Sequence, residues 1–313
     1  RAGCTWKECF FIMNKIFKGL LVAVMFTSMC ACSSDETSQS SQVETSELSL
    51  SFFDASVESF DKTRADDDAP KTLKDYFDQL DIAIIPQDKT QNPNEIHVKQ
   101  SSTDADFGKL STRLPIGKYT LVAIASKKSL EVTITSPTLA SFSDEHISDM
   151  ASVCQEIDVK SGANTVNAVL HRCFTRLVIL STDKEERNVD KMVVTYKGKF
   201  SKLFNPTTGF GIADEQENTY TKNISLDHTG TLSTVKINFS TFIPEETVSL
   251  TMDIKLYSAD NTPVRSLHFD DVKVQQGHVT TYTGPLFSAG SSLNFAFDNV
   301  SLVKSDYDVS FGD

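Results

Sequence analysis

The sequence predicts an all-β protein that folds as two tandem β-sandwich domains, at residues 48–175 and 176–288. Its composition is typical of pleated surfaces, with 21 phenylalanines, a single tryptophan and frequent Thr, Ser and Val. Apolar and polar residues alternate in many short segments, whereas helical periodicity is limited to a short turn at 73–77. A second cycle of strands begins at Leu177, which places the domain junction just before it.

Residues 13–31 have the features of a bacterial lipoprotein signal peptide. The segment opens with the basic residues Lys15 and Lys18 and continues with the uncharged run 19–29. A membrane-spanning helix needs about 20 apolar residues, so this run of about ten predicts export and not a transmembrane anchor. Residues 1–12 then form an upstream leader that is not expected to be part of the fold.

The end of this segment offers two cysteines for lipid attachment. Cys32 follows Ala31, which is small enough for a signal peptidase pocket, whereas Cys30 follows the bulkier Met29. We therefore expect cleavage between Ala31 and Cys32 and lipidation of Cys32, where several acyl chains together give stable anchoring. A secretory peptide that is cut nearby without lipidation is the alternative. Residues 32–47 are rich in Ser, Thr, Gln and Glu and predict a disordered tether.

The N-terminal domain is expected to begin with a strand on which Leu48, Leu50 and Phe52 share one apolar face. An acidic stretch with Arg64 and Ala65 follows. We interpret it either as a solvated loop or as a processing site for a trypsin-like protease, because a basic residue in a flexible loop is easily cleaved. Further strands are expected at 80–85, 120–125, 157–159 and 166–170.

The C-terminal domain repeats this pattern. Its most regular strand is 248–256, where apolar residues lie on one face and Ser, Thr, Asp and Lys on the other. Other strands are expected at 177–180, 192–196, 235–239, 264–269, 272–274 and 279–283. In the C-terminal tail, 289–313, apolar residues alternate at Leu293, Phe295 and Phe297. Such a strand needs a groove, either in its own sandwich or in a neighbouring molecule.

Composition and spacing give no support for an enzyme, a metal site or a nucleic-acid partner. The formal net charge of −12 repels phosphate backbones. The six histidines are scattered without the spacing of metal ligands, and no serine lies in a nucleophile-elbow motif. We therefore predict no catalytic residue, no metal and no cofactor. Cys154 and Cys173 either form a disulfide, which persists in an exported protein, or remain free thiols.

Five short segments follow the lipoprotein signal in a distinctive order and spacing. They are 63–65, 106–110, 114–123, 208–211 and 282–287. Together they resemble the fimbrillin-type family, which contains the fimbrial subunits and lipid-retaining fimbrial anchors of Gram-negative gut and oral anaerobes. The resemblance spans residues 48–288 and implies that both domains are transthyretin-like β-sandwiches.

The resemblance also implies assembly with other fimbrial subunits by strand exchange. In stalk subunits of this kind, a trypsin-like protease removes an N-terminal strand, and a segment of another subunit fills the vacated groove by β-augmentation. On this chain the removable strand would be 48–53, the cut would lie between Arg64 and Ala65, and the donor strand would lie around 293–297. Anchor members keep their lipid and their first strand.

The sequence thus predicts a lipid-anchored protein of the outer membrane and cell surface, a fimbrial subunit that acts as an anchor or accessory component and supports adhesion. Asp35 and Glu36, just after Cys32, resemble signals that send lipoproteins to the outer leaflet. The rival hypothesis is a non-polymerising, glycan-binding outer-membrane lipoprotein on the same fold. Since the mature chain has no Trp, its sugar platform would use Tyr or Phe.

Overall fold

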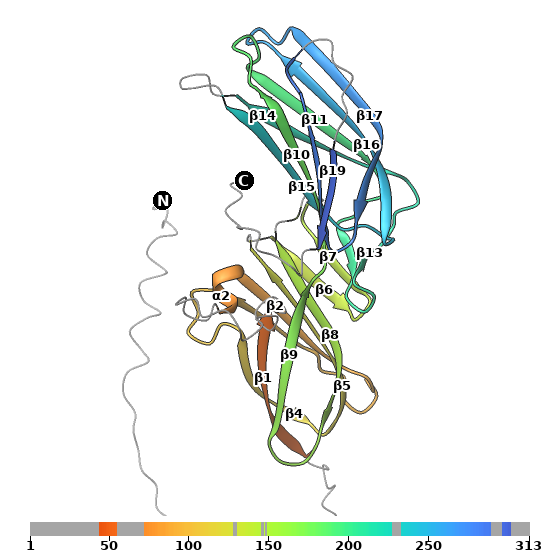
Figure 1. Ribbon diagram of the computed structural model, residues 1–313. Helices are drawn as coiled ribbons and strands as arrows, with labels where there is room; N and C mark the ends of the chain where they lie inside the picture. Colours follow the sequence, from red (N-terminus) through yellow and green to blue (C-terminus); the bar gives the residue numbers. More distant parts are fainter. Residues whose placement is uncertain are drawn as a thin grey trace, which may run out of the picture. The chain divides into compact units, whose positions relative to one another are not determined.

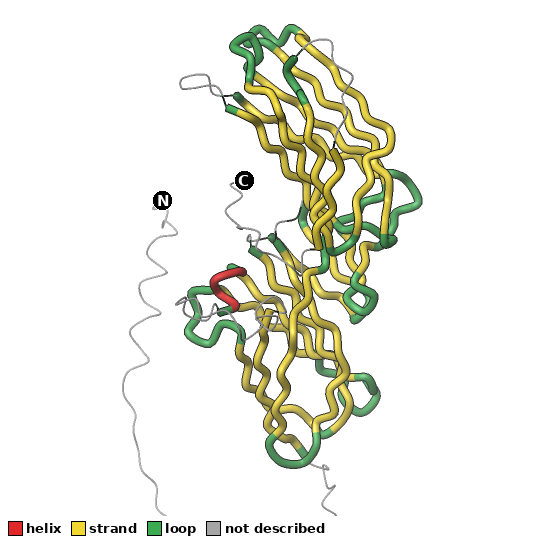
Figure 2. The backbone as a smooth tube through the Cα atoms, in the orientation of Figure 1, coloured by secondary structure: helices red, strands yellow, loops and turns green. Residues whose placement is uncertain are grey.

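The computed structural model describes residues 44–54, 72–127, 130–144, 147, 149–226, 233–288 and 296–301. These residues form strands almost throughout, and their one helix is the four-residue α2 (Leu73–Tyr76) (Figures 1 and 2). All of these described residues belong to one compact unit. The prediction of an all-β sandwich fold is confirmed. The predicted leader and signal peptide lie outside the described residues.

The first nine strands build what we call the N-terminal module. They are β1 (Thr45–Asp54), β2 (Gln79–Pro86), β3 (Ile96–Ser101), β4 (Lys109–Pro115), β5 (Gly117–Ser126), β6 (Val132–Ser136), β7 (Leu139–Phe142), β8 (Met150–Val159) and β9 (Asn164–Arg172). Seven of them pair in the order β3-β2-β5-β8-β9-β1-β4. Only two residue pairs join β8 to β9. At this weak junction the sheet divides into two layers, β3-β2-β5-β8 and β9-β1-β4. The layers face each other, since Leu50 of β1 and Ile82 of β2 belong to one core.

The remaining strands build the C-terminal module. They are β10 (Thr175–Lys184), β11 (Lys191–Gly198), β12 (Leu203–Asn205), β13 (Phe210–Gly211), β14 (Asn218–Ser225), β15 (Thr234–Thr241), β16 (Thr247–Tyr257), β17 (Pro263–Gln275), β18 (His278–Gly284) and β19 (Ala296–Ser301). One layer has the order β15-β10-β18-β19 and the other β14-β11-β16-β17. Leu177, Met192 and Ile254 belong to the core of this module. The strand predicted at 248–256 is confirmed as β16, whose burial alternates as its sequence does.

The two modules share one strand topology. The first strand of each, β1 or β10, pairs antiparallel with β4 or β15 and parallel with the last strand, β9 or β18. The opposite layers, β3-β2-β5-β8 and β14-β11-β16-β17, also correspond strand for strand. Among the described strands β19 is the exception, because it extends the layer of β18 while no strand takes the equivalent place beside β9.

A shared sheet and a third core join the modules. Strands β6 and β7 follow β5, strands β12 and β13 follow β11, and the four together form the sheet β13-β12-β7-β6. In the core beside it, the ring centroid of Phe242 lies 4.7 Å from that of Phe204 and 5.0 Å from that of Phe142. Ile85 reaches this core from β2, which explains why the strand predicted at 80–85 is buried on both faces. The shared sheet crosses the expected domain boundary.

A buried ion cluster also joins the modules. Asp149, just before β8, accepts a hydrogen bond from Arg176 of β10, and its Oδ2 lies 3.8 Å from Nη1 of Arg172 at the end of β9. Arg176 also donates to Oγ of Ser240 in β15 at 3.0 Å. The Arg172 guanidinium lies over the ring of Phe77, 4.9 Å from its centroid. The three charged side chains are at most 11% exposed, so the Asp149 carboxylate balances buried positive charge on both guanidinium groups.

Candidate strand-exchange site

The strand that the sequence predicts to be removable lies in the interior of its sheet. β1 pairs with β4 on one side and with β9 on the other, over seven residue pairs each (Figure 1). Leu48, Leu50 and Phe52 are 1%, 2% and 4% exposed and belong to the core of the N-terminal module. Burial of each such side chain contributes about 1.5–3 kcal/mol. Loss of β1 would leave an apolar groove with unpaired backbone groups on both sides.

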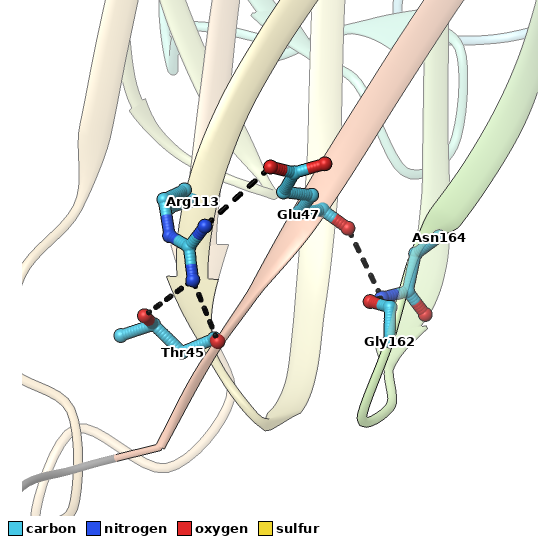
Figure 3. A network of polar contacts seen from close by, with 5 residues as sticks. All are labelled: Thr45, Glu47, Arg113, Gly162 and Asn164. Atoms are coloured by element: carbon cyan, nitrogen blue, oxygen red, sulfur yellow. Dashed lines mark hydrogen bonds and ion pairs between the residues drawn. The ribbon is translucent and has the colours of Figure 1, made fainter.

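β1 begins at Thr45, inside the segment 32–47 that the sequence predicts as tether, which corrects the end of that segment. These first residues are polar, and contacts from the neighbouring strands hold them. Figure 3 shows Arg113 of β4 donating to the Thr45 carbonyl at 3.3 Å and to the Glu47 carboxylate at 3.4 Å. The Asn164 side chain of β9 donates to the Glu47 carbonyl at 3.1 Å. Because the Arg113–Glu47 pair is exposed, it contributes about 0–1 kcal/mol, less than the apolar centre of β1.

A cavity of about 720 Å³ lies at the other end of β1. Its apolar wall includes Phe107 and Phe53, which is 42% exposed. Thr103 and Asp104 add hydroxyl and carboxylate groups to the lining. The cavity thus combines aromatic rings with groups that can orient a polar ligand by hydrogen bonds.

The C-terminal strand pairs with its own module. β19 runs antiparallel to β18, and Phe297 lies opposite Tyr282 in the ladder. The sequence places this strand at 293–297, whereas its described part is shifted towards the C-terminus. Leu293 and Phe295 lie outside the described residues. The sequence leaves open whether this strand packs in its own sandwich or in a neighbouring molecule, and in this structure it pairs within its own chain.

Asp183, near the end of β10, holds the backbone from which the tail departs. Its carboxylate accepts hydrogen bonds from the amides of Leu286 at 2.8 Å, Phe287 at 2.9 Å and Ser288 at 2.7 Å, and from the Ser288 hydroxyl at 2.6 Å. Burial raises the pKa of Asp183, but these hydrogen bonds outweigh burial and lower the pKa below its ordinary value. Sequence patterns do not single out Asp183, because its partners lie 103 to 105 positions further along the chain.

Asp183→Asn is expected to loosen the tail at neutral pH. The lowered pKa means that the carboxylate stabilises the fold above the ordinary value of 3.8 and loses this effect as the pH falls through the folded value. One charge-assisted hydrogen bond contributes about 1.5–3 kcal/mol, so amides of β18 and β19 should exchange hydrogen about tenfold faster or more. Asp260→Asn is the matched control, since among the described residues Asp260 accepts its hydrogen bonds from Ser258 and Thr262 of its own turn. Equal exchange in both variants would contradict the role of Asp183.

The two cysteines are free thiols, so of the two alternatives the structure has the unbonded one. Cys154 of β8 is half-buried, with its Sγ 3.6 Å from Oγ1 of Thr207. Cys173, between β9 and β10, is buried, and burial raises the pKa of its thiol to about 12. Because the thiolate is the nucleophilic form, Cys173 is poorly suited to nucleophilic chemistry at neutral pH.

Several predicted sites lie outside the described residues, namely Ala31 and Cys32 at the signal cleavage site and Arg64 and Ala65 at the processing site. Within the described ranges, no group of three or more His, Cys, Asp or Glu side chains could hold a metal ion. The described part of the chain also contains no helix that is long and apolar enough to cross a membrane.

A family model, described as the family of unknown function DUF6562, matches residues 131–305. No curated protein matches the sequence. Because the family model covers more than half of the chain, the match establishes family membership but supplies no activity.

Several solved structures are similar to this chain. A candidate adhesin from Bacteroides ovatus has a TM-score of 0.49 and 12% identity, over 82% of this chain and 98% of that one. The fimbrial anchor protein Mfa2 from Porphyromonas gingivalis has a TM-score of 0.44 and 8% identity, over 82% of this chain and 97% of that one. The tip fimbrial protein Mfa3 from Porphyromonas gingivalis, with a C-terminal truncation, has a TM-score of 0.43 and 9% identity, over 82% of this chain and 100% of that one. Fimbrial proteins, the class that the motifs resemble, are thus among them.

Proposed function

Because this chain belongs to DUF6562, a family of unknown function, we propose its function from its own strands. We propose that it is a lipid-anchored fimbrial subunit of the cell surface, that it serves as an anchor or accessory component in adhesion, and that it assembles with other subunits by strand exchange. The position of β1 in the interior of its sheet carries this proposal.

Three features suit β1 for replacement by a strand of another subunit. A single cut between Arg64 and Ala65 would separate β1 from the rest of its module, since the next strand begins at Gln79. Its two neighbours offer one antiparallel and one parallel ladder to an incoming strand. Its alternating apolar side chains can be reproduced by any strand with the same alternation, such as 293–297 of the tail.

The proposed anchor is the lipid on Cys32. The chain between Cys32 and the start of β1 at Thr45 spans at most about 45 Å when fully extended, so an uncut chain stays close to the membrane. A cut after Arg64 would break the covalent link between the body of the protein and the lipid, and replacement of β1 would then release the body from the membrane. An anchor therefore has to keep this bond intact, whereas a released subunit has to lose it.

Replacement of the lipidated cysteine tests the proposal in cells. Cys32→Ala should abolish palmitate incorporation and move the protein from the outer-membrane fraction to the soluble fraction, with fimbriae shed from the surface. Cys30→Ala, which removes the neighbouring cysteine, should leave lipidation and location unchanged. Retention of C32A in the outer membrane, or no fimbrial defect in that strain, would overturn the proposed anchoring role.

One observation favours a second function, glycan binding without polymerisation. The cavity at the end of β1 places the exposed ring of Phe53 near Thr103 and Asp104, a suitable surface for a sugar ring. A glycan array probed with the full chain and with Phe53→Ser tests it. Specific glycan binding that F53S abolishes, together with the absence of SDS-resistant multimers, would replace the fimbrial proposal by this one.

A further inference from the structure

The outer side of β9 is an open strand edge among the described residues. β9 pairs with β1 along its inner side over seven residue pairs, but its outer side meets β8 at only two pairs, which involve His171 and Arg172. No described strand pairs with the outer side of 164–170. Such an edge presents N–H and C=O groups that can pair with another chain.

The C-terminal module shows which kind of strand fits this place. β18 corresponds to β9, because each is the last strand of its module and runs parallel to the first. The outer edge of β18 is covered by β19, which runs antiparallel to it over six residue pairs. In the N-terminal module, no described strand takes the position that corresponds to that of β19.

A groove of about 510 Å³ accompanies the open edge. It is lined by Cys154 and Gln155 of β8 and by Asn167 and Val169 of β9, and the turn 206–210 adds a further wall. Among the described strands, β8 is also unpaired on this side, because it pairs with β5 along its other edge and with β9 only at its start. The groove therefore has room for the side chains of an added strand.

The charges of the groove and of the C-terminal tail are compatible. None of the residues that line the groove is Asp or Glu, although the chain has a formal net charge of −12. The tail from residue 296 onward carries Asp298, Asp306, Asp308 and Asp313 against the single cation Lys304. Like charges opposite each other destabilise strand pairs, and an acidic strand meets no acidic side chain in this groove.

From the equivalence of β9 and β18, we infer that the outer edge of β9 is a docking edge for β19 of a second copy of this chain. The incoming strand runs antiparallel to β9, as β19 does to β18. A second copy is needed because β19 of the same chain covers β18. The exchange is near balance, since one ladder replaces an equivalent one, as in domain swapping. The inference rests on the proposed function in that tail strands pass between subunits, but it requires no removal of β1.

Hydrogen exchange of the uncut full chain in detergent tests this inference. The probe is a synthetic peptide with the sequence of residues 293–304, and a scrambled peptide of the same composition is the control. We expect saturating probe to slow exchange of those amides at 165–170 that point away from β1 about tenfold or more, since they gain ladder partners. The scrambled peptide should have no effect.

A pair of matched variants locates the binding edge. Asn167→Lys places a charge on the exposed face of β9 and should abolish the protection, because Lys on an edge strand opposes pairing. Asn223→Lys makes the same change on β14, an outer strand of the C-terminal module, and should leave protection intact. Thr165→Lys, also exposed on β9, replaces N167K if that variant does not fold.

Protection of β9 that N167K removes and N223K retains would support the inference. Absence of protection in β9 would overturn it, as would protection confined to β18, because the peptide would then displace β19 in place of occupying β9. Neither of these two results affects the exchange of β1 or the lipid anchor. Conversely, a C32A strain with normal fimbriae would overturn the proposed function while leaving the docking edge on β9 intact.

Discussion

Leu50→Asp in β1 is expected to detach this strand and unfold the N-terminal module. Leu50 is 2% exposed and lies opposite Leu110 of β4 and Val166 of β9. The variant loses about 1.5–3 kcal/mol of apolar burial and adds several kcal/mol for an unpaired buried carboxylate. The sum approaches the total stability of a typical domain, about 5–15 kcal/mol. Urea unfolding should show the loss.

Ser49→Asp is the matched control for this prediction. Ser49 is exposed and lies opposite Ser111 and Thr165, so a carboxylate there stays in water. We expect the control to change the free energy of unfolding by about 0.5 kcal/mol or less. Equal destabilisation by the two variants would show that β1 does not occupy the sheet interior, and the strand-exchange proposal would lose its basis.

Asp149→Ala is expected to have the second large effect, because it removes the Asp149 carboxylate from beside the buried guanidinium groups of Arg172 and Arg176. Removal of one partner from a buried ion pair typically costs about 3–5 kcal/mol. Since Arg176 belongs to β10 and Arg172 to β9, both modules should be destabilised together. Differential scanning calorimetry should show one transition at a lower temperature.

Asp158→Ala provides the comparison. Asp158 lies near the end of β8, the strand that begins directly after Asp149. Its carboxylate is 53% exposed and 3.7 Å from Lys160, so its loss should cost at most about 1 kcal/mol. Two separate transitions in D149A, with the C-terminal module unchanged, would contradict a joint between the modules at this cluster.

The parts of the fold that sequence could predict are those in which each strand carries its own apolar pattern. Apolar and polar residues alternate along the whole of β16, and Leu48, Leu50 and Phe52 give β1 the same alternation. Local periodicity is therefore sufficient to predict both strands. The run 80–85 indicates burial on both faces, and the third core supplies the reason. In these segments the pairing partner adds little information to what the strand itself contains.

The parts that sequence could not predict depend on distant residues. Phe204 of β12 pairs with Ala140 of β7, and nothing in either short segment indicates a sheet shared by both modules. Thr45 is polar and carries no apolar strand pattern, yet it pairs with β4 and its carbonyl accepts a hydrogen bond from Arg113. Asp183 looks like any surface carboxylate until the amides around Ser288 are placed beside it. Long-range hydrogen bonds leave no periodic signal in a sequence.

The most direct test of strand exchange uses chains cut between Arg64 and Ala65. Cut chains are incubated together and run on SDS gels without heating, in parallel with uncut chains and with cut chains truncated after Ser288. We predict a ladder of SDS-resistant multimers from the cut chains with a tail and monomers from both controls, because only the first sample has both an emptied groove and a donor strand. Cut chains that release β1 and remain monomeric, or a ladder that persists without the tail, would contradict strand exchange at the position of β1.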